Sequence, residues 1–164
     1  MFTALAPLAM SLLFVSAMAD EGFRPVLIPF EEHGYSNFQT TVLHNEKEWR
    51  VFLSTHSTEK GMGWNERRRF IKAVEAAKVN FEYEALVIMR HTEGRISTRV
   101  AFNPVGLNDR TLHCKIERQE TEAGLTAIGF YGFVLAVDKR AVDKIILDVG
   151  QLNTQEIWVS SNPK

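Results

Sequence analysis

The chain has few of the residues from which disulfide, metal and catalytic sites are usually built. It contains one cysteine, so no disulfide can form within the chain and stability must come from packing. Five histidines are present, but no two have the HxxxH or HxH spacing that offers two nitrogens to one metal. Gly-x-Ser-x-Gly elbows and phosphate-binding loops are absent. These gaps favour a protein that is not an enzyme and that holds no cofactor.

An excess of charge of one sign is also lacking. The 19 basic and 20 acidic residues leave a net charge of −1, so no overall field directs the protein to nucleic acid or to a membrane. The only run of three basic residues is Arg67, Arg68 and Arg69. On a helix, three consecutive residues spread over about 200° of the surface, and Glu66 and Glu75 dilute their charge. This arrangement favours a solvated helix face over an anion site.

A long apolar segment occurs at the N-terminus. Residues 1–19 have no charged side chain and end in Ala17, Met18 and Ala19, which is typical of a signal-peptide cleavage site. We expect cleavage after Ala19, leaving residues 20–164 as one domain in the periplasm or outside the cell. No Lys or Arg precedes the apolar run, so either the α-amino group supplies the usual charge or the true start lies upstream. The alternative is an uncleaved anchor, because about 20 apolar residues can span a bilayer.

Residues 84–102 predict the centre of the fold. Their first half is an unbroken apolar run of strand length, which suits a strand covered on both faces, and their second half alternates as a half-solvated strand does. Glu93 and Gly94 offer a turn between the halves, since glycine enters positive φ without steric cost. We therefore expect a β-hairpin whose first strand is central and whose second strand lies nearer an edge.

A first helix is predicted shortly before this hairpin. Asn45 and Glu48 have the spacing of a capping box. The apolar residues that follow at helical spacing are Trp49, Phe52 and Leu53. After them, residues 54–64 are polar and interrupted by glycine, which predicts a long surface loop.

A second helix is predicted over residues 65–78, with Asn65 as its cap. Its apolar face comprises Phe70, Ile71, Val74 and Ala77. The side chains expected in water are Glu66, Arg67, Arg68 and Lys72. Such an amphipathic helix should pack on the sheet.

The remaining segments read as strands. Two prolines within residues 23–30 limit that segment to an edge strand. Residues 111–117 alternate with Leu112, Cys114 and Ile116 inward, which favours a buried, inert thiol over a nucleophile.

A nearly apolar run follows at residues 125–137, where two glycines favour a strand with a bend or bulge near Gly129 and Gly132. Shorter strands are expected within residues 38–43, 144–149 and 156–159. The prediction is an α+β fold with a mostly antiparallel sheet of five or more strands and two helices packed on it.

Two exposed segments are candidates for an interaction site. Met62 and Trp64 are large apolar groups in the predicted loop, a common kind of interface element. The alternative is that Trp64 folds back onto the second helix as a hydrophobic staple. At the expected hairpin tip, Arg90, His91 and Arg95 would form a basic cluster that meets an acidic partner, or else protects a sheet edge from aggregation.

Four segments are similar to one known family. Residues 32–36 end a β-segment as Glu-His-Gly-Tyr-Ser, and residues 42–49 look like a strand leading into a helix with an aromatic near its start. Residues 79–88 look like a short polar and aromatic step into an apolar strand, and residues 133–139 like a strand ending in lysine. Over residues 29–149 the chain resembles the PrcB C-terminal-like domain family, named for an accessory subunit of a secreted bacterial protease complex.

This resemblance implies a small exported α+β domain that associates with another protein, with a protease as the implied partner, and no catalytic residue to carry over. One motif departs from it. Where the family tends to carry a glycine-rich turn, residues 92–98 read Thr-Glu-Gly-Arg-Ile-Ser-Thr, so an interaction made by that turn would be altered. We predict a non-enzymatic interaction domain that acts as an accessory or regulatory partner of a secreted or periplasmic protease, with membrane contact only if residues 1–19 stay attached.

Two other classes of function remain open. A domain that binds a small molecule or an envelope glycan would arrange aromatics such as Tyr35, Trp64 and Tyr131 around a cleft. A hydrolase or metal enzyme would need residues distant in sequence to meet in the fold.

Overall fold

A computed structural model describes residues 22–29, 35–57, 64–94, 98–119, 128–150 and 153–160. The predicted signal segment 1–19 lies outside this part of the chain, as do Met62 and Arg95. The described residues form two helices and two four-stranded sheets, which confirms the α+β class. None of these helices has the length and apolarity needed to cross a membrane, among the residues described.

The first sheet has the order β1-β6-β3-β2, and all of its strands are antiparallel to their neighbours. Its members are β1 (Phe23–Val26), β6 (Gly129–Asp138), β3 (Glu84–Glu93) and β2 (Thr41–Leu43). The second sheet has the order β4-β5-β7-β8, in which β5 and β7 run parallel. Its members are β4 (Arg99–Asn108), β5 (Thr111–Gln119), β7 (Lys144–Asp148) and β8 (Thr154–Trp158).

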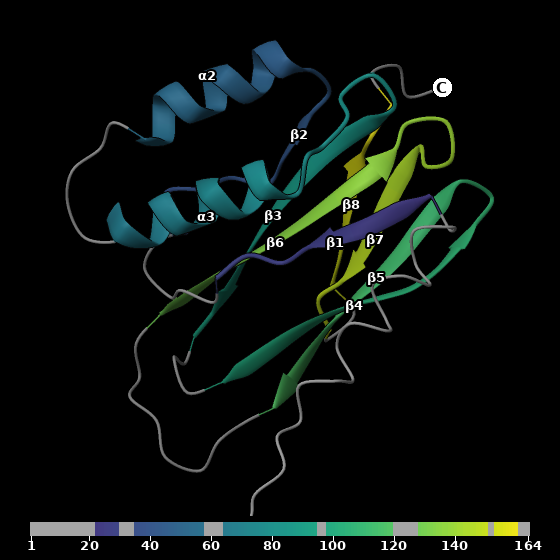
Figure 1. Ribbon diagram of the computed structural model, residues 1–164. Coiled ribbons are helices and arrows are strands. Elements are labelled where there is room, and N and C mark those ends of the chain that lie inside the picture. Colours follow the sequence, from purple (N-terminus) through teal and green to yellow (C-terminus); the bar gives the residue numbers. More distant parts are fainter. Residues whose placement is uncertain are drawn as a thin grey trace, which may run out of the picture.

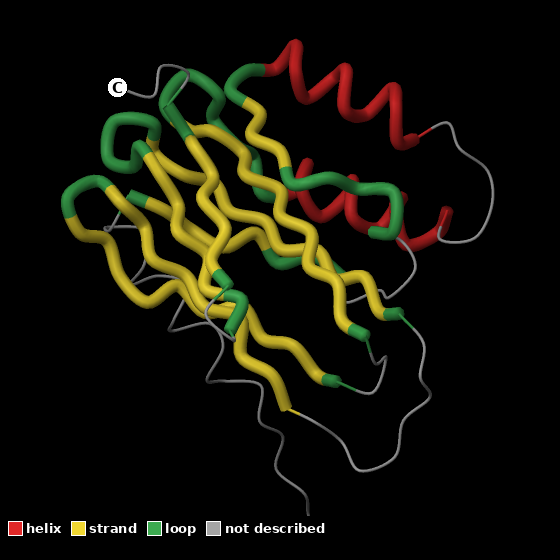
Figure 2. Tube along the Cα trace, turned by 180° about the vertical axis from the view of Figure 1, so that it is seen from behind, coloured by secondary structure: helices red, strands yellow, loops and turns green. Residues whose placement is uncertain are grey.

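The fold has three layers, because the first sheet is covered on both faces. Figure 1 shows α2 (Glu46–Ser57) and α3 (Trp64–Ala76) on one side of β3 and β6, with the second sheet on the other side. Figure 2 gives the same arrangement from behind. The apolar run of β3 supplies both interfaces, because successive strand residues point to opposite faces. Leu86 and Ile88 join the core under the helices, whereas Val87 and Met89 join the core between the sheets.

The predicted hairpin of residues 84–102 is wrong, although both of its strands exist. β3 pairs with β6 and β2, while β4 pairs with β5 in the other sheet. The chain therefore leaves the first sheet after Glu93 and enters the second at Arg99. The predicted positions within a sheet are confirmed, since β3 is interior and β4 lies at an edge. The expected sheet of five or more strands is also wrong, because eight strands divide into two sheets of four.

The bulge expected near Gly129 and Gly132 is likewise absent from the β3–β6 ladder, which runs in unbroken register from Glu84 opposite Asp138 to Glu93 opposite Gly129. A register shift occurs instead in β4 between Pro104 and Gly106. Proline has no N–H for the ladder, which explains why the irregularity falls at an edge strand that contains one.

The capping box at the start of α2 is confirmed. Asn45 Oδ1 accepts a bond from the Glu48 N–H at 3.0 Å, and Asn45 Nδ2 donates to Glu48 Oε1 at 2.8 Å. The other carboxylate oxygen of Glu48 accepts from the His44 N–H at 2.6 Å. Trp49 and Phe52 are buried as expected. The helix continues through Ser57, so the start of the predicted loop is helical, and residues 58–63 lie outside the described residues.

α3 begins and ends within two residues of the predicted bounds, but Asn65 is not its cap, because the helix already includes Trp64. Lys78 has a φ of 48°, in the left-handed region, which ends the helical path just after Ala76. Phe70 and Val74 are buried as expected. Arg67, however, is also buried, against the prediction that it lies in water. It precedes Phe70 by three residues and Val74 by seven, so it lies on the same stripe of the helix, where a long side chain can bury its aliphatic stem.

Candidate functional site

Arg90 and His91 do not form the basic cluster that was predicted for them at a hairpin tip. Arg90 and His91 are consecutive in β3, so their side chains leave opposite faces of the sheet. Arg95 lies outside the described residues, as does Met62. Trp64 begins α3, but its side chain is outside the described part of the chain, so its role as interface or staple stays a prediction.

The Arg90 side chain lies on the face of the first sheet that the helices cover. Its Nη1 donates to the Ser36 carbonyl at 2.9 Å, and its guanidinium carbon lies 5.7 Å from the centre of the Phe130 ring. Its backbone N–H donates to Thr40 Oγ1 at 3.2 Å. These contacts attach the turn before β2 to β3, so Arg90 is a packing residue rather than an exposed recognition group.

His91 faces the other sheet and joins a charged cluster there. It is 8% exposed, and its Nε2 bonds to Glu93 Oε1, which requires the ring proton on Nε2 because a carboxylate only accepts. Arg118, near the end of β5, donates through Nε to the same oxygen, and its Nη2 lies 3.4 Å from His91 Nε2. The cluster therefore links the two sheets where the apolar core between them ends.

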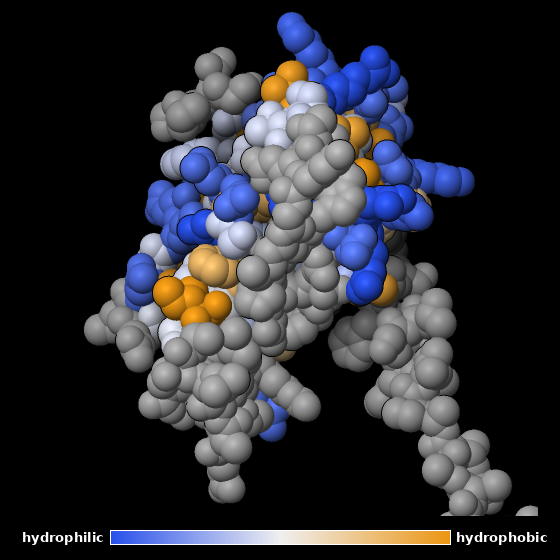
Figure 3. Space-filling view, turned by 90° about the vertical axis from the view of Figure 1, so that its left-hand side faces the viewer, coloured by the Kyte–Doolittle hydropathy of each residue, from blue (hydrophilic) through white to orange (hydrophobic). Residues whose placement is uncertain are grey.

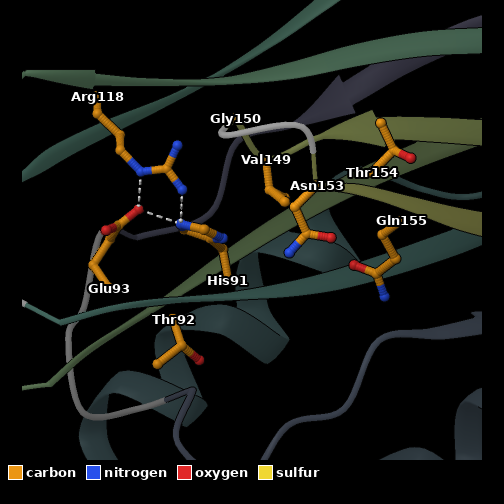
Figure 4. A pocket seen from close by; sticks show the side chains of 9 residues that line it. All are labelled: His91, Thr92, Glu93, Arg118, Val149, Gly150, Asn153, Thr154 and Gln155. Carbon is orange, nitrogen blue, oxygen red and sulfur yellow. Dashed lines mark hydrogen bonds and ion pairs between the residues drawn. The ribbon is translucent and has the colours of Figure 1, made fainter.

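A cavity of about 690 Å³ opens beside this cluster and is one of two candidate sites in the described part of the chain. We call it the polar cleft. Its described lining comprises His91, Thr92, Glu93, Arg118, Val149, Gly150, Asn153, Thr154 and Gln155. Figure 4 shows Arg118 and Glu93 on one side of the His91 ring and Asn153 on the other. The cleft thus lies between the end of β3 and the turn that joins β7 to β8.

Gly150 shapes the wall of the polar cleft nearest to Arg118. Its φ of +80° is in the left-handed region, and a Cβ at this position would lie 2.8 Å from Arg118 Nη1. The turn is held by a bond from the Gly150 N–H to Asp148 Oδ1 at 2.8 Å and by one from the Asn153 N–H to the Gly150 carbonyl at 3.0 Å. A glycine here lets the guanidinium approach the turn closely.

A second hollow, of about 630 Å³, lies between β2 and α2, and we call it the strand-edge groove. Its described lining comprises Thr41, Val42, Leu43, Asn45, Lys47, Glu48, Val51, Phe52, Thr55 and His56. β2 is the last strand of its sheet, and no described strand pairs with its outer edge. Val51 lines the groove and is 58% exposed, so a large apolar side chain faces solvent there.

Elsewhere the exposed apolar residues are scattered. On the side drawn in Figure 3, most of the described surface is hydrophilic and the apolar spots are small and separate. Isolated residues of this kind are normal on a soluble protein. Tyr35 and Tyr131, which were expected to line a binding cleft, are each only 1% exposed and belong to the cores, so that part of the prediction is wrong.

Two observations on the described residues concern catalytic and metal chemistry. Burial of Cys114 raises the pKa of its thiol to about 12, so the nucleophilic thiolate is suppressed. That result confirms the predicted inert thiol. No group of three or more His, Cys, Asp or Glu side chains in the described part of the chain could hold a metal ion.

Sequence analysis missed Arg118 and the β7–β8 turn, although a signal for Arg118 was present. Leu112, Cys114 and Ile116 alternate inward along β5, and continuing that alternation by two residues places Arg118 on the same face. The same parity places His91 inward after Val87 and Met89. The meeting of the two strand ends was not predictable, because the strands belong to different sheets.

Comparison with known proteins identifies no relative of this chain: no family model, no curated protein and no solved structure matches it.

Proposed function

We propose that this chain is a non-enzymatic protein-interaction domain that binds an extended segment of a partner protein in the strand-edge groove. The expected signal segment and the resemblance described above favour an exported domain whose partner is a secreted or periplasmic protease. The observation that carries the proposal is the unpaired outer edge of β2 beside an apolar groove. Adding a strand to such an edge is a recurring way of recognising peptides.

The backbone of β2 supports this mode of binding. In a strand that ends a sheet, alternate N–H and C=O groups point away from the ladder and are available to another strand. The ladder would be short, because β2 has three residues and the His44 N–H already donates to Glu48. The apolar side chains in the groove must therefore supply much of the binding energy.

The groove offers suitable apolar contacts. Val51 of α2 is exposed there, whereas Leu43 of β2 and Phe52 of α2 are largely buried in the core under the helices. Burying one aliphatic side chain of a partner against them contributes about 1.5–3 kcal/mol. Of the other three edge strands, β1 and β4 are less suitable, because they contain Pro25 and Pro104, which lack a backbone donor, whereas β8 contains no proline.

Selection of peptides from a displayed random library against residues 20–164 tests the proposal. We expect enriched peptides with apolar residues at alternate positions. Their affinity should fall about tenfold or more in Val51→Glu, which places a charge in the groove. Val105→Glu is the matched control, because Val105 is 69% exposed on β4, in the other sheet.

N-methylation of the selected peptide separates strand addition from simple apolar contact. Methyl groups on alternate backbone nitrogens that face β2 should abolish binding, whereas methyl groups on the intervening nitrogens should be tolerated. The proposal fails if the library yields no binder, or if binding is indifferent to both Val51→Glu and N-methylation.

A further inference from the structure

We propose that the polar cleft is a second binding site, independent of the strand-edge groove, and that it takes a carboxylate-bearing molecule whose carboxylate is held by Arg118. The cleft combines a cation, two amides and two hydroxyls around a cavity of about 690 Å³, and its lining also includes Glu93, whose carboxylate pairs with Arg118. A site of this size can hold a small ligand.

The charged cluster beside the cavity is already organised. The side chains of His91 and Glu93 are 9% and 13% exposed, and burying charged groups is costly unless they are paired. Glu93 satisfies both His91 and the Nε of Arg118 through one oxygen. An ion pair whose only role is to join the two sheets requires no cavity beside it. Close packing around such a pair would stabilise the fold more than an open cavity does.

Arg118 is oriented so that part of its guanidinium remains available. Nε is engaged by Glu93, and Nη2 has only a long contact of 3.4 Å with His91. Nη1 lies against the space that a Cβ on Gly150 would occupy. Figure 4 shows the outer edge of the guanidinium turned toward the β7–β8 turn, inside the cleft. Two nitrogens on one edge form the fork that binds a carboxylate with two parallel hydrogen bonds.

The rest of the lining selects among carboxylates. Asn153 and Gln155 bring amides that both donate and accept, and Thr154 adds a hydroxyl. Val149 is the one large apolar residue in the described lining, so a long hydrocarbon chain would find little to contact. We infer that the ligand carries hydroxyl or amide groups next to its carboxylate. A sugar acid and the C-terminal residue of a peptide both have this chemistry.

Binding of matched probes to residues 20–164 tests this site. D-galacturonate is compared with neutral D-galactose, and a short peptide ending in a free carboxylate is compared with its C-terminal amide. Calorimetry gives affinities, and amide chemical shifts locate the site at Gly150 and Asn153. We expect one or both carboxylates to bind, and their neutral counterparts to bind at least about tenfold more weakly. Which carboxylate binds identifies the source of the ligand.

Variants connect any binding to the proposed contacts. Arg118→Lys keeps the charge but removes the fork, and we expect about tenfold weaker binding. Asn153→Leu changes an exposed turn side chain, keeps the backbone bonds of the turn, and should weaken binding while leaving the unfolding temperature unchanged. Arg110→Lys is the control, because this exposed arginine pairs with Asp143, which is not among the residues lining the cleft.

The proposal is overturned if neither carboxylate binds at millimolar concentration, or if every carboxylate that binds does so no more tightly than its neutral counterpart. It is also overturned if Asn153→Leu and Arg118→Lys bind as the unaltered chain does. The peptide selection described above uses Val51→Glu, which lies in the other hollow, so failure of one proposal leaves the other intact.

Discussion

Gly132 has no side chain, and this allows an aromatic ring to pack directly against the backbone of β6. It lies opposite Arg90 in the β3–β6 ladder, and a Cβ there would come within 2.9 Å of two ring carbons of Tyr35. That ring is fully buried, and it packs edge-on against Phe38 at 5.5 Å and Phe70 at 5.8 Å between ring centres. The glycine is therefore needed because an aromatic ring covers the strand.

We predict that Gly132→Ala lowers the free energy of unfolding by about 1–3 kcal/mol, because the added methyl group overpacks the core against Tyr35. Urea unfolding followed by circular dichroism measures the change. Gly106→Ala is the control, since a Cβ at Gly106 meets no heavy atom within 4 Å, and it should alter stability by less than about 0.5 kcal/mol. Equal stability of the two variants would contradict the close approach of Tyr35.

At the level of elements, α2 depends on the charge of its capping residue. The pKa of Glu48 is lowered, first by the hydrogen bond from the His44 backbone and further by the side chains of His44 and Asn45. A carboxyl group whose pKa is lower in the folded protein stabilises the fold when it is ionised. That stabilisation is present above the ordinary glutamate pKa of 4.5 and is lost as the pH falls through the lower, folded-state value.

We therefore predict that Glu48→Gln destabilises the protein near neutral pH and that the difference from the unaltered chain shrinks as the pH falls below the ordinary glutamate pKa of 4.5. The measurement is urea unfolding at several pH values. Glu75→Gln serves as the control, because Glu75 is an exposed glutamate on the other helix, in the last turn of α3 and away from its N-terminus. A difference that stays constant from neutral to acid pH would show that the carboxylate makes no charge-dependent contribution.

The pairing of the strands explains why the hairpin predicted for residues 84–102 does not form. Each half has the pattern of a strand, and a glycine follows the first half, so a local hairpin was the simplest interpretation. The structure pairs each half with a more distant strand instead, β3 with β6 and β4 with β5. Strand patterns are local, whereas the choice of partner depends on long-range packing.

At the scale of the whole molecule, β3 and β6 hold the two cores together. Leu135 and Val137 of β6 face the second sheet, and Val134 and Ala136 face the helices. Loss of either interface would expose one face of the shared sheet to water. The three layers should therefore unfold as one cooperative unit.

We predict that Leu135→Ala lowers the free energy of unfolding by about 2–5 kcal/mol, because it leaves a cavity between the sheets. In variants with a single tryptophan, fluorescence of Trp49, on α2, or of Trp158, on β8, should report the same unfolding midpoint as circular dichroism of that same variant. Leu27→Ala is the control, since Leu27 is 77% exposed. Two separate midpoints would show that the helix layer and the second sheet unfold independently.

Properties that depend on near neighbours were determined by the sequence itself. The capping pair Asn45 and Glu48, the helical stripes, the inward side of β5 and the doubly covered character of β3 all follow from spacings of a few residues. Tertiary structure alone decided how eight strands divide between two sheets, why Arg67 is buried, and how His91 and Arg118 meet at the polar cleft. Those outcomes depend on contacts between distant residues, and periodicity along the chain carries no information about which distant surfaces pack together.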